Sequence, residues 1–456
     1  MKLTIIGGGS VRTPRLIPSL VRRAAALRLE EVWLMDIDGD KLELIAGLCR
    51  SMADEQGATF RLITTTDARA AIRDADAVIT SIRPGSEQGR ATDERIAMRH
   101  GVLGQETTGA AGFAMAMRSL PAILDYAHMV EDIAAPGAWI YNFTNPAGLV
   151  AQGLTYAGIK RVVGICDSAN GAQHAVSRYL KIPMRRLRHS VYGLNHLSWT
   201  ASVRVDPDDD GSGGEEVLPA LLGDEGFIGS THMAMFDPGL IAWQKAFLNE
   251  YLHYFYHRDE ALAALLDKAE TRGEETLRLT NDLLERLHNA PSMDAALAAY
   301  REVMGQRSAT YMAHARHGQD RVKMEPVADD EEGYAAVALG CIQAISTGTT
   351  TYTGLNVPNR GAIPQMLDDD VVEVTCRVNA DSITALPVSG IHDDQLLLMQ
   401  TVKLYERLAS RAILERSREL AYEALAVHPL IGSYPLAYSL TDAFLDAHRD
   451  LIGAWS

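Results

Sequence analysis

The sequence predicts an α/β protein with an N-terminal Rossmann-like parallel sheet and a mainly helical C-terminal part of mixed α and β structure. Two observations predict this fold. Through the first third of the chain, short apolar runs rich in Ile and Val alternate with helical patterns, which is typical of a parallel sheet covered by helices. The first of these runs leads directly into a glycine-rich turn at residues 7–9, as in doubly wound folds.

The expected strands are short and apolar, as strands buried on both faces of a sheet are. They are Lys2–Gly7, Val32–Ile37, Arg61–Thr66, Ala77–Ile82, Ala138–Thr144 and Val162–Asp167. Between these runs, apolar residues at helical spacing predict helices over Pro14–Leu29, Asp40–Gln56 and Ser119–Ile133.

Beyond about residue 200 the pattern changes. The polar stretch Arg204–Glu216 predicts a turn or hairpin tip, and Asp237–Gly318 is mostly helical in its pattern. The last segment, Glu331–Ser456, predicts a helix, a strand at Val371–Arg377 and one long helix over Asp393–His428. Because 456 residues exceed one ordinary domain, we expect two domains, over residues 1–200 and 201–456.

Composition argues against several kinds of partner. With 47% hydrophobic residues the chain can build a full-sized core, and its 43 Lys and Arg are outnumbered by 59 Asp and Glu. A net charge of −16 would repel nucleic acid and anionic membrane surfaces, so we expect neither as a partner. The four cysteines form no CxxC pair and the N-terminus has no signal-peptide pattern, which predicts a reducing, cytoplasmic location.

A polar turn follows the first expected strand and consists of Gly7, Gly8, Gly9 and Ser10. A turn without Cβ atoms lets a pyrophosphate reach the N-terminus of the next helix. Arg12 stands where the third glycine of GxGxxG is usual, so the bare motif is weak and a plain glycine turn is the alternative. Asp36, at the end of the second strand, would bind both ribose hydroxyls, which predicts NAD rather than NADP.

Polar residues also follow the later strands, at the edge where ligands bind in open parallel sheets. They are Arg83, Asn145, the pair Cys166-Asp167, and the pair Asn195-His196 after an apparent strand at Ser190–Gly193. A buried Cys is most often part of the core, but a Cys at one strand end and a His at another could instead chelate a metal. From residue type alone, thiolate and imidazole ligands suggest zinc or iron.

Taken together, these residues resemble glycoside hydrolase family 4, the NAD- and divalent-metal-dependent glycosidases, and most closely its 6-phospho-β-glucosidases. The most specific stretches are GQETTG, FTNP and GLNHL. Others are IIGGGSVRTP, VWLMDID, RPGSEQGRATDE, GICD, NEYLHYF, NRGAI and KLYERL. The resemblance runs from Met1 to about His428 in the family's order, so it covers nearly the whole chain.

This resemblance implies a redox-neutral hydrolysis, an exception to the two-carboxylate scheme of most glycosidases. NAD takes a hydride from C3 of the sugar, and a base then removes the acidified C2 proton. A divalent metal, usually manganese in this family, stabilises the resulting enediolate. The glycosidic oxygen leaves by elimination, water adds, and the hydride returns to C3.

The resemblance also implies a role for each residue at the strand ends. Cys166 and His196 would be the metal ligands, and Tyr251 would be the C2 base. The NAD-binding residues would be Gly7, Gly8, Gly9, Ser10, Asp36, Arg83 and Asn145. The sugar and a charged group at C6 would be bound by Arg12, Arg90, Glu106, Asn145, Asn195 and Arg272. For Arg272, an ion pair on a helix surface is the alternative.

At two places the chain departs from the phospho-β-glucosidase pattern. Residues 166–169 read Cys-Asp-Ser-Ala instead of Cys-Asn-Val-Pro, and Cys-Asp resembles the phospho-α-glucosidases. Asp167 is therefore the candidate general acid, and the preferred anomer stays open. Residues 12–15 read Arg-Thr-Pro-Arg instead of Tyr-Thr-Pro-Glu, and this extra positive charge could signal another C6 anion. The related NAD-dependent sulfoquinovosidases, which take a C6 sulfonate, are thus an alternative.

Two further function classes stay open. One is an ordinary NAD-dependent dehydrogenase acting on a sugar or hydroxy acid, for which NADH would accumulate during turnover. The other is a non-catalytic NAD-sensing protein, but a sensor would need none of Tyr251, Cys166 and His196. NRGAI and the helical C-terminal part resemble segments that meet between subunits in the family, which implies a homodimer or homotetramer.

Overall fold

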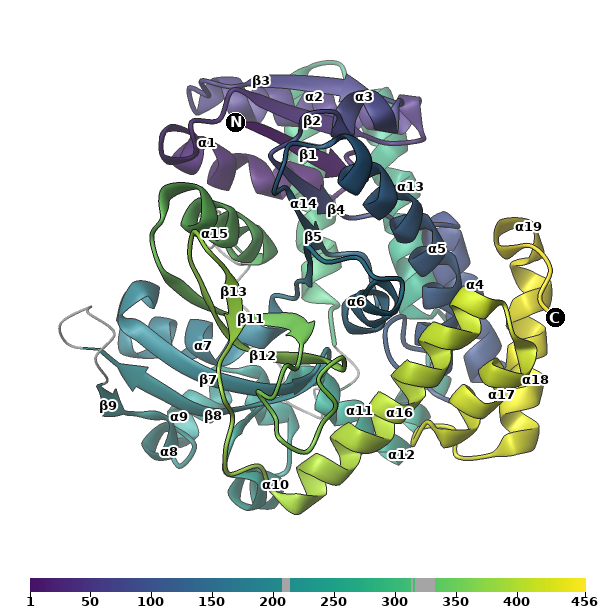
Figure 1. The fold of residues 1–456 in the computed structure, drawn as a ribbon. Helices are drawn as coiled ribbons and strands as arrows, with labels where there is room; N and C mark the ends of the chain where they lie inside the picture. Colours follow the sequence, from purple (N-terminus) through teal and green to yellow (C-terminus); the bar gives the residue numbers. More distant parts are fainter. Residues whose placement is uncertain (207–213, 313–314, 316–332) are drawn as a thin grey trace.

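Six parallel strands form the N-terminal part of the main sheet in this computed structural model, which describes residues 1–206, 214–312, 315 and 333–456 (Figure 1). They are β1 (Lys2–Ile6), β2 (Glu31–Met35), β3 (Arg61–Thr65), β4 (Ala77–Thr80), β5 (Trp139–Asn142) and β6 (Val162–Gly164). Their spatial order, β3-β2-β1-β4-β5-β6, is that of a dinucleotide-binding sheet. All six predicted strands are confirmed, and each ends one to three residues earlier than its apolar run.

Three antiparallel strands from the C-terminal part extend this sheet. They are β11 (Thr351–Pro358), β12 (Val371–Val378) and β13 (Ile383–Ala385). The strand β11 pairs with β6 at Asn356 and Gly164, giving nine strands in the order β13-β12-β11-β6-β5-β4-β1-β2-β3. The two parts of the chain therefore share one sheet, and the predicted domain division at residue 200 stays a prediction.

A smaller antiparallel sheet carries a tight hairpin. Its strands are β7 (Leu187–Leu194), β8 (Leu197–Val205), β9 (Glu215–Glu216) and β10 (Phe247–Leu248). The turn between β7 and β8 holds only Asn195 and His196, and His196 has a left-handed backbone, with φ of 63°. Of the polar turn predicted at 204–216, residues 207–213 lie outside the described residues, and Arg204 pairs with Glu216 across it.

Helices follow most strands of the N-terminal part. They are α1 (Ile17–Leu27), α2 (Gly39–Glu55), α3 (Ala68–Ile72), α4 (Ser86–Arg99), α5 (Gly109–Ile133), α6 (Ala147–Tyr156) and α7 (Gly171–Leu180). The predicted helix at 14–29 begins as a short 3-10 helix, and the one at 119–133 starts ten residues earlier. The helix α4 was not predicted because its buried face includes the charged residues Arg90, Asp93 and Glu94, which hide the apolar period.

The C-terminal half is mainly helical, as predicted. Its helices are α8 (Leu218–Leu221), α9 (Glu225–Gly229), α10 (Pro238–Gln244), α11 (His253–Tyr256), α12 (Arg258–Leu266), α13 (Arg272–His288), α14 (Met293–Ala309), α15 (Gly333–Thr347), α16 (Asp393–Glu415), α17 (Arg418–Val427), α18 (Tyr434–Ala447) and α19 (Arg449–Ile452). The single long helix predicted over 393–428 is wrong. Arg416 takes a left-handed φ of 52° that ends α16, and the Ser417 hydroxyl accepts the Leu420 N–H to start α17.

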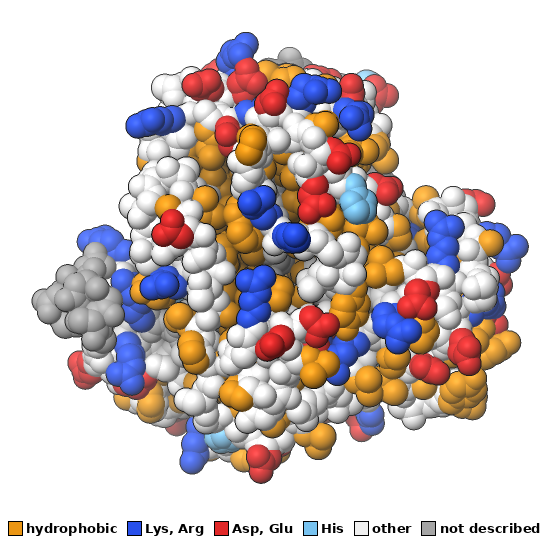
Figure 2. All heavy atoms as spheres, viewed as in Figure 1, with side chains coloured by type: hydrophobic (Ala, Val, Ile, Leu, Met, Phe, Trp, Pro, Cys, Tyr) orange, Lys and Arg blue, Asp and Glu red, His pale blue; other side chains and the backbone are white. Residues whose placement is uncertain are grey.

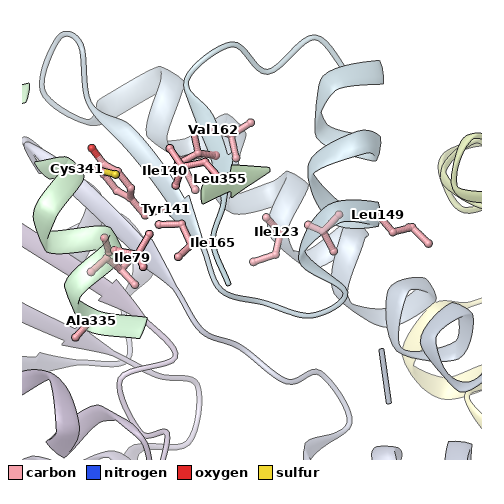
Figure 3. Close-up of a cluster of buried hydrophobic side chains, with 14 of the residues drawn as sticks. Ile79, Ile123, Ile140, Tyr141, Leu149, Val162, Ile165, Ala335, Cys341 and Leu355 are labelled. Carbon is pink, nitrogen blue, oxygen red and sulfur yellow. The ribbon is translucent and has the colours of Figure 1, made fainter. Parts of the chain in front are cut away.

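One apolar core runs through both parts of the chain. Figure 3 shows one cluster of this core, in which Ile79, Tyr141 and Leu355 come from β4, β5 and β11, Ile165 directly follows β6, and Cys341 comes from α15. Burial raises the pKa of the Cys341 thiol to about 12, so this cysteine is a core residue. Across the part of the chain that the structure describes, no helix combines the length and the apolar character needed to cross a bilayer.

Candidate active site

The glycine turn after β1 is shaped for close approach. Gly7 has a φ of 92°, and a Cβ there would lie 2.3 Å from the Ser81 carbonyl oxygen. The Gly9 N–H donates to Asp36 Oδ2 at 2.9 Å, and a Cβ on Gly9 would lie 2.9 Å from the same oxygen. The turn thus presents bare backbone beside the Asp36 carboxylate. This cradle, which side chains would fill, fits the predicted dinucleotide site.

Cys166 and His196 meet although 30 positions separate them. Cys166 follows β6, His196 occupies the β7–β8 turn, and the distance from Cys166 Sγ to His196 Nε2 is 3.3 Å. On the other side of the ring, His196 Nδ1 lies 2.8 Å from Thr107 Oγ1. Donation from Nδ1–H to Thr107 would leave the Nε2 lone pair facing the thiol.

The chemistry of this pair fits a divalent cation. Burial lowers the pKa of His196 to about 4, which keeps the imidazole neutral and able to coordinate. Burial, followed by the Asp167 carboxylate, raises the pKa of Cys166 well above its ordinary value, so a thiolate there requires a cation. Among the described residues, no group of three His, Cys, Asp or Glu is placed to hold a metal. An ion on this pair would keep positions open for substrate oxygens, as catalytic metals do.

Tyr251 stacks on the His196 ring, with ring centroids 3.8 Å apart and an interplanar angle of 11°. Asn249 fixes the backbone there, because its side chain accepts the Tyr251 N–H at 3.0 Å. Burial and the adjacent Glu250 carboxylate raise the pKa of Tyr251 well above its ordinary value. The phenol can therefore serve as a base near neutrality only beside a positive charge, and the Cys166–His196 pair is where a cation would lie.

A cluster of arginines and glutamates joins this centre through Glu106. Arg83 Nη1 lies 2.5 Å and Arg90 Nη1 3.0 Å from Glu106 Oε2, and Arg90 Nε donates to Glu94 at 2.7 Å. Burial alone would raise the pKa of Glu106, but the guanidinium groups of Arg83 and Arg90 hold it far below its usual range. Since Glu106 precedes Thr107, one loop contacts both the arginines and His196.

Figure 2 shows a hollow in the face in view, with basic and apolar side chains around it. Arg12 is exposed, and its charge acts on both Glu106 and Arg307. Arg307 Nη2 lies 3.3 Å from Glu87 Oε1. Burial, together with Arg12 and its other arginine neighbours, lowers the pKa of Arg307 to about 10. Positive charge is therefore concentrated around the Glu106 loop.

Arg272 makes a different set of contacts. It donates to Glu275 Oε2 at 2.7 Å, to Thr310 Oγ1 at 2.6 Å and to the Arg307 carbonyl at 2.6 Å. These contacts fit the alternative interpretation, in which Arg272 forms an ion pair on a helix surface. Its role in substrate binding stays a prediction.

The remaining predicted residues lie at the ends of β5, β6 and β7. Asn145 is half-buried before a cis peptide bond to Pro146, and Asp167 Oδ1 is 3.9 Å from Cys166 Sγ. Asn195 accepts the Gly148 N–H at 3.3 Å and donates to Glu373 Oε1 at 3.2 Å. Their roles toward substrate and cofactor stay predictions.

Five residues at the site were not predicted from the sequence: Thr107, Glu250, Arg307, Tyr311 and Glu373. Thr107 and Glu250 lie inside the GQETTG and NEYLHYF stretches, so their position beside predicted residues could have indicated them. Glu373 is the one acid in the apolar strand VVEVTCRV, which is a sign of a buried polar role. Arg307 and Tyr311 carry no local pattern, because only the packing brings them here.

Glu373 holds three polar side chains next to the site. Its carboxylate accepts hydrogen bonds from Asn195 Nδ2 at 3.2 Å, Asn356 Nδ2 at 3.1 Å and Ser198 Oγ at 2.7 Å. Burial outweighs these three donors and raises the pKa of Glu373 to about 7. The carboxyl group is thus near half protonation at neutral pH.

Glu373→Gln is expected to stabilise the metal-free protein at alkaline pH. Because the folded state binds the Glu373 proton more tightly, the wild-type free energy of unfolding falls as pH rises from about 4.5 to about 7. The E373Q protein lacks this titration, so above that window it should gain about 3 kcal/mol over wild type. Urea unfolding of both proteins across the window measures the difference. A difference that does not change with pH would contradict the raised pKa.

Comparison with known proteins identifies the family of the chain. The model "Family 4 glycosyl hydrolase" matches residues 2–182, and the model "Family 4 glycosyl hydrolase C-terminal domain" matches residues 191–431. A 6-phospho-beta-glucosidase of Escherichia coli is 31% identical, over 98% of this chain and 95% of that protein.

Two solved structures share the fold over nearly their whole length. The 6-phospho-beta glucosidase of Thermotoga maritima, with manganese, NAD+ and glucose-6-phosphate, has a TM-score of 0.82 at 26% identity, covering 99% of each chain. A 6-phospho-alpha-glucosidase from gut microorganisms, with NAD and Mn2+, has a TM-score of 0.80 at 25% identity, covering 100% of this chain and 98% of that one. The resemblance to glycoside hydrolase family 4 is confirmed, and the chain belongs to the family 4 glycosyl hydrolases.

Proposed function

We propose that this enzyme hydrolyses 6-phospho-glucosides by the redox-neutral route, with NAD and a divalent metal such as Mn2+ as cofactors. The observation that carries the proposal is the 3.3 Å approach of Cys166 Sγ to His196 Nε2 directly beside the stacked Tyr251 ring. The ligands named for the Thermotoga maritima structure, manganese, NAD+ and glucose-6-phosphate, support the same cofactors and the same C6 anion.

Each part of the site has a task in this reaction. When bound, NAD would supply reversible hydride transfer at C3, and the metal would supply a Lewis acid for the C2 and C3 oxygens. Cys166 and His196 would hold the metal. The Tyr251 oxygen would take the C2 proton, and Asp167 would deliver a proton to the glycosidic oxygen as it leaves. The glycine turn and Asp36 would bind the dinucleotide.

The C6 phosphate would bind at the arginine cluster. Four arginines, Arg12, Arg83, Arg90 and Arg307, act there against the three carboxylates Glu87, Glu94 and Glu106. The arginines of this cluster outnumber its carboxylates, although the whole protein has a net charge of −16. This local excess of positive charge would attract an anion. Phosphate rather than sulfonate, the anomer, the oligomer and the cytoplasmic location remain predictions within this proposal.

In the Arg90→Lys protein, the fold increase in KM for a 6-phospho-glucoside is expected to be about ten times the fold decrease in kcat. The reason is that an ammonium group cannot replace the two parallel N–H donors of a guanidinium group. Steady-state kinetics with the phosphorylated and the unphosphorylated glucoside measure this preference. Arg95→Lys is the matched control, since Arg95 lies on the same helix and pairs with Glu274. Equal effects on both glucosides would show that Arg90 does not bind the phosphate.

The test of the function is a panel of nitrophenyl glycosides with phosphate or sulfonate at C6, in both anomers, assayed with NAD and Mn2+. Cleavage of a 6-phospho-glucoside without net NADH formation is expected, with deuterium entering C2 in heavy water. Steady accumulation of NADH would indicate a dehydrogenase instead. Cleavage confined to the sulfonates would overturn the choice of phosphate, and the two anomers decide the stereochemical preference.

A further inference from the structure

A hydrogen-bonded chain connects the residue after Asp167 to the Tyr251 oxygen. Ser168 Oγ donates to Glu250 Oε1 at 2.8 Å. The hydroxyl of Tyr311 lies 3.4 Å from the same carboxylate oxygen and 3.0 Å from the Tyr251 hydroxyl oxygen. Three segments far apart in the sequence, the ends of β6, β10 and α14, are thus linked at one phenol.

The Tyr251 ring is already fixed by other contacts. Stacking on His196 sets the plane of the ring, and the Asn249 side chain holds its backbone. These contacts leave the direction of the phenolic O–H undetermined. The Tyr311 hydroxyl is placed to determine it, because a donor 3.0 Å away occupies one lone pair of the Tyr251 oxygen.

The segment that carries Tyr311 is itself held in place by hydrogen bonds. It lies two residues beyond the end of α14, in a segment whose conformation Arg272 braces. The Arg272 guanidinium donates to Thr310 Oγ1 and to the Arg307 carbonyl, both at 2.6 Å. An arginine on the last carbonyls of a helix is a favourable helix-end contact. Through this brace, Arg272 contributes to the place of the Tyr311 hydroxyl.

We propose that Tyr311 is a positioning residue whose hydroxyl donates its single proton to the Tyr251 oxygen. The inference rests on the proposed function, in which Tyr251 takes the C2 proton. Because the Tyr311 donor occupies one lone pair of the Tyr251 oxygen, the direction in which the other lone pair can accept the C2 proton is set. Hydride transfer at C3 does not involve the Tyr251 oxygen, so Tyr311 acts on the C2 step alone.

Tyr311→Phe removes only the hydroxyl, so it tests this separation of steps. In the full enzyme with NAD, Mn2+ and a 6-phospho-glucoside, we expect C2 exchange in heavy water to slow about tenfold. NADH formation in a single turnover should stay within about twofold of wild type. Tyr256→Phe is the matched control, because the Tyr256 hydroxyl contacts Gln244 on α10 and both rates should be unchanged.

Each other outcome is decisive. If Tyr311→Phe slows both steps equally, Tyr311 has a merely structural role and the proposal is overturned. If neither step slows, the hydrogen bond has no part in the reaction, which overturns it as well. Wild-type protein that cleaves the substrate without C2 exchange would refute the proposed function itself.

Discussion

Replacing Cys166 by serine is expected to lower kcat/KM for a 6-phospho-glucoside by roughly a thousandfold at fixed Mn2+, since Lewis-acid catalysis contributes several kcal/mol. The thiol is one of the two ligands proposed among the described residues, and it lies 3.3 Å from His196 Nε2. A serine hydroxyl is a much poorer anionic ligand than a thiolate, so the ion should be held weakly. Calorimetric titration with Mn2+ measures the affinity independently of turnover.

The pH dependence of Mn2+ binding tests the same assignment. Burial raises the pKa of Cys166 well above its ordinary value, so the free protein carries the thiol and binding must release its proton. Because the proton leaves when the metal binds, affinity should rise about tenfold per pH unit near neutrality. His196, with a pKa lowered to about 4, stays neutral through this range and adds no slope.

Cys341→Ser is the matched control, since that thiol lies in the core between α15 and the main sheet. It should leave Mn2+ affinity unchanged, whatever it does to stability. Undiminished binding by the C166S protein, or an affinity that does not vary with pH, would show that the thiol is not a ligand.

Replacing Tyr251 by phenylalanine is expected to reduce kcat by about a hundredfold to ten-thousandfold, the usual contribution of a positioned general base. The ring and its stacking on His196 would be retained, so substrate binding and NADH formation in a single turnover should change little. Exchange of the C2 hydrogen in heavy water should be lost together with hydrolysis. Magnetic resonance of the recovered sugar measures that exchange.

Tyr192→Phe is the control, because the Tyr192 hydroxyl donates to Gln395 in the protein interior and has no proposed role in the reaction. It should retain hydrolysis and C2 exchange. If the Y251F protein still exchanges the C2 hydrogen at the wild-type rate, another group removes that proton. The proposal for Tyr311 would then fail with the role of Tyr251.

Local pattern in the sequence determined the parallel sheet and the cofactor turn. Strands such as β1 and β4 are short, buried and mostly apolar, and burial on both faces of the sheet favours that pattern wherever the rest of the chain lies. The glycine turn and Asp36 are also local, since the first two strands are neighbours in the sheet. The predicted strand ends placed Cys166 correctly after a strand of the parallel sheet, but the strand before His196 belongs to the smaller antiparallel sheet, and His196 reaches Cys166 from its hairpin turn.

Features whose cause is not local were missed or wrong. The helix α4 buries Arg90, Asp93 and Glu94, and those charges are stable inside only because partners elsewhere in the chain meet them. The break at Arg416 was not predicted. A left-handed backbone is signalled in a sequence by glycine, and this position holds an arginine. Motifs of the family led to Tyr251, but nothing nearby indicated Tyr311, 60 positions away.

The sequence by itself thus determined the fold class, the cofactor turn and the family, because periodicity and motifs are properties of neighbouring residues. Only the tertiary structure decided which distant side chains touch: the thiol on the imidazole, Glu106 between two arginines, and one phenol on another. These contacts depend on how helices and strands pack. Packing is fixed by the whole buried surface, and no short segment of the chain encodes it.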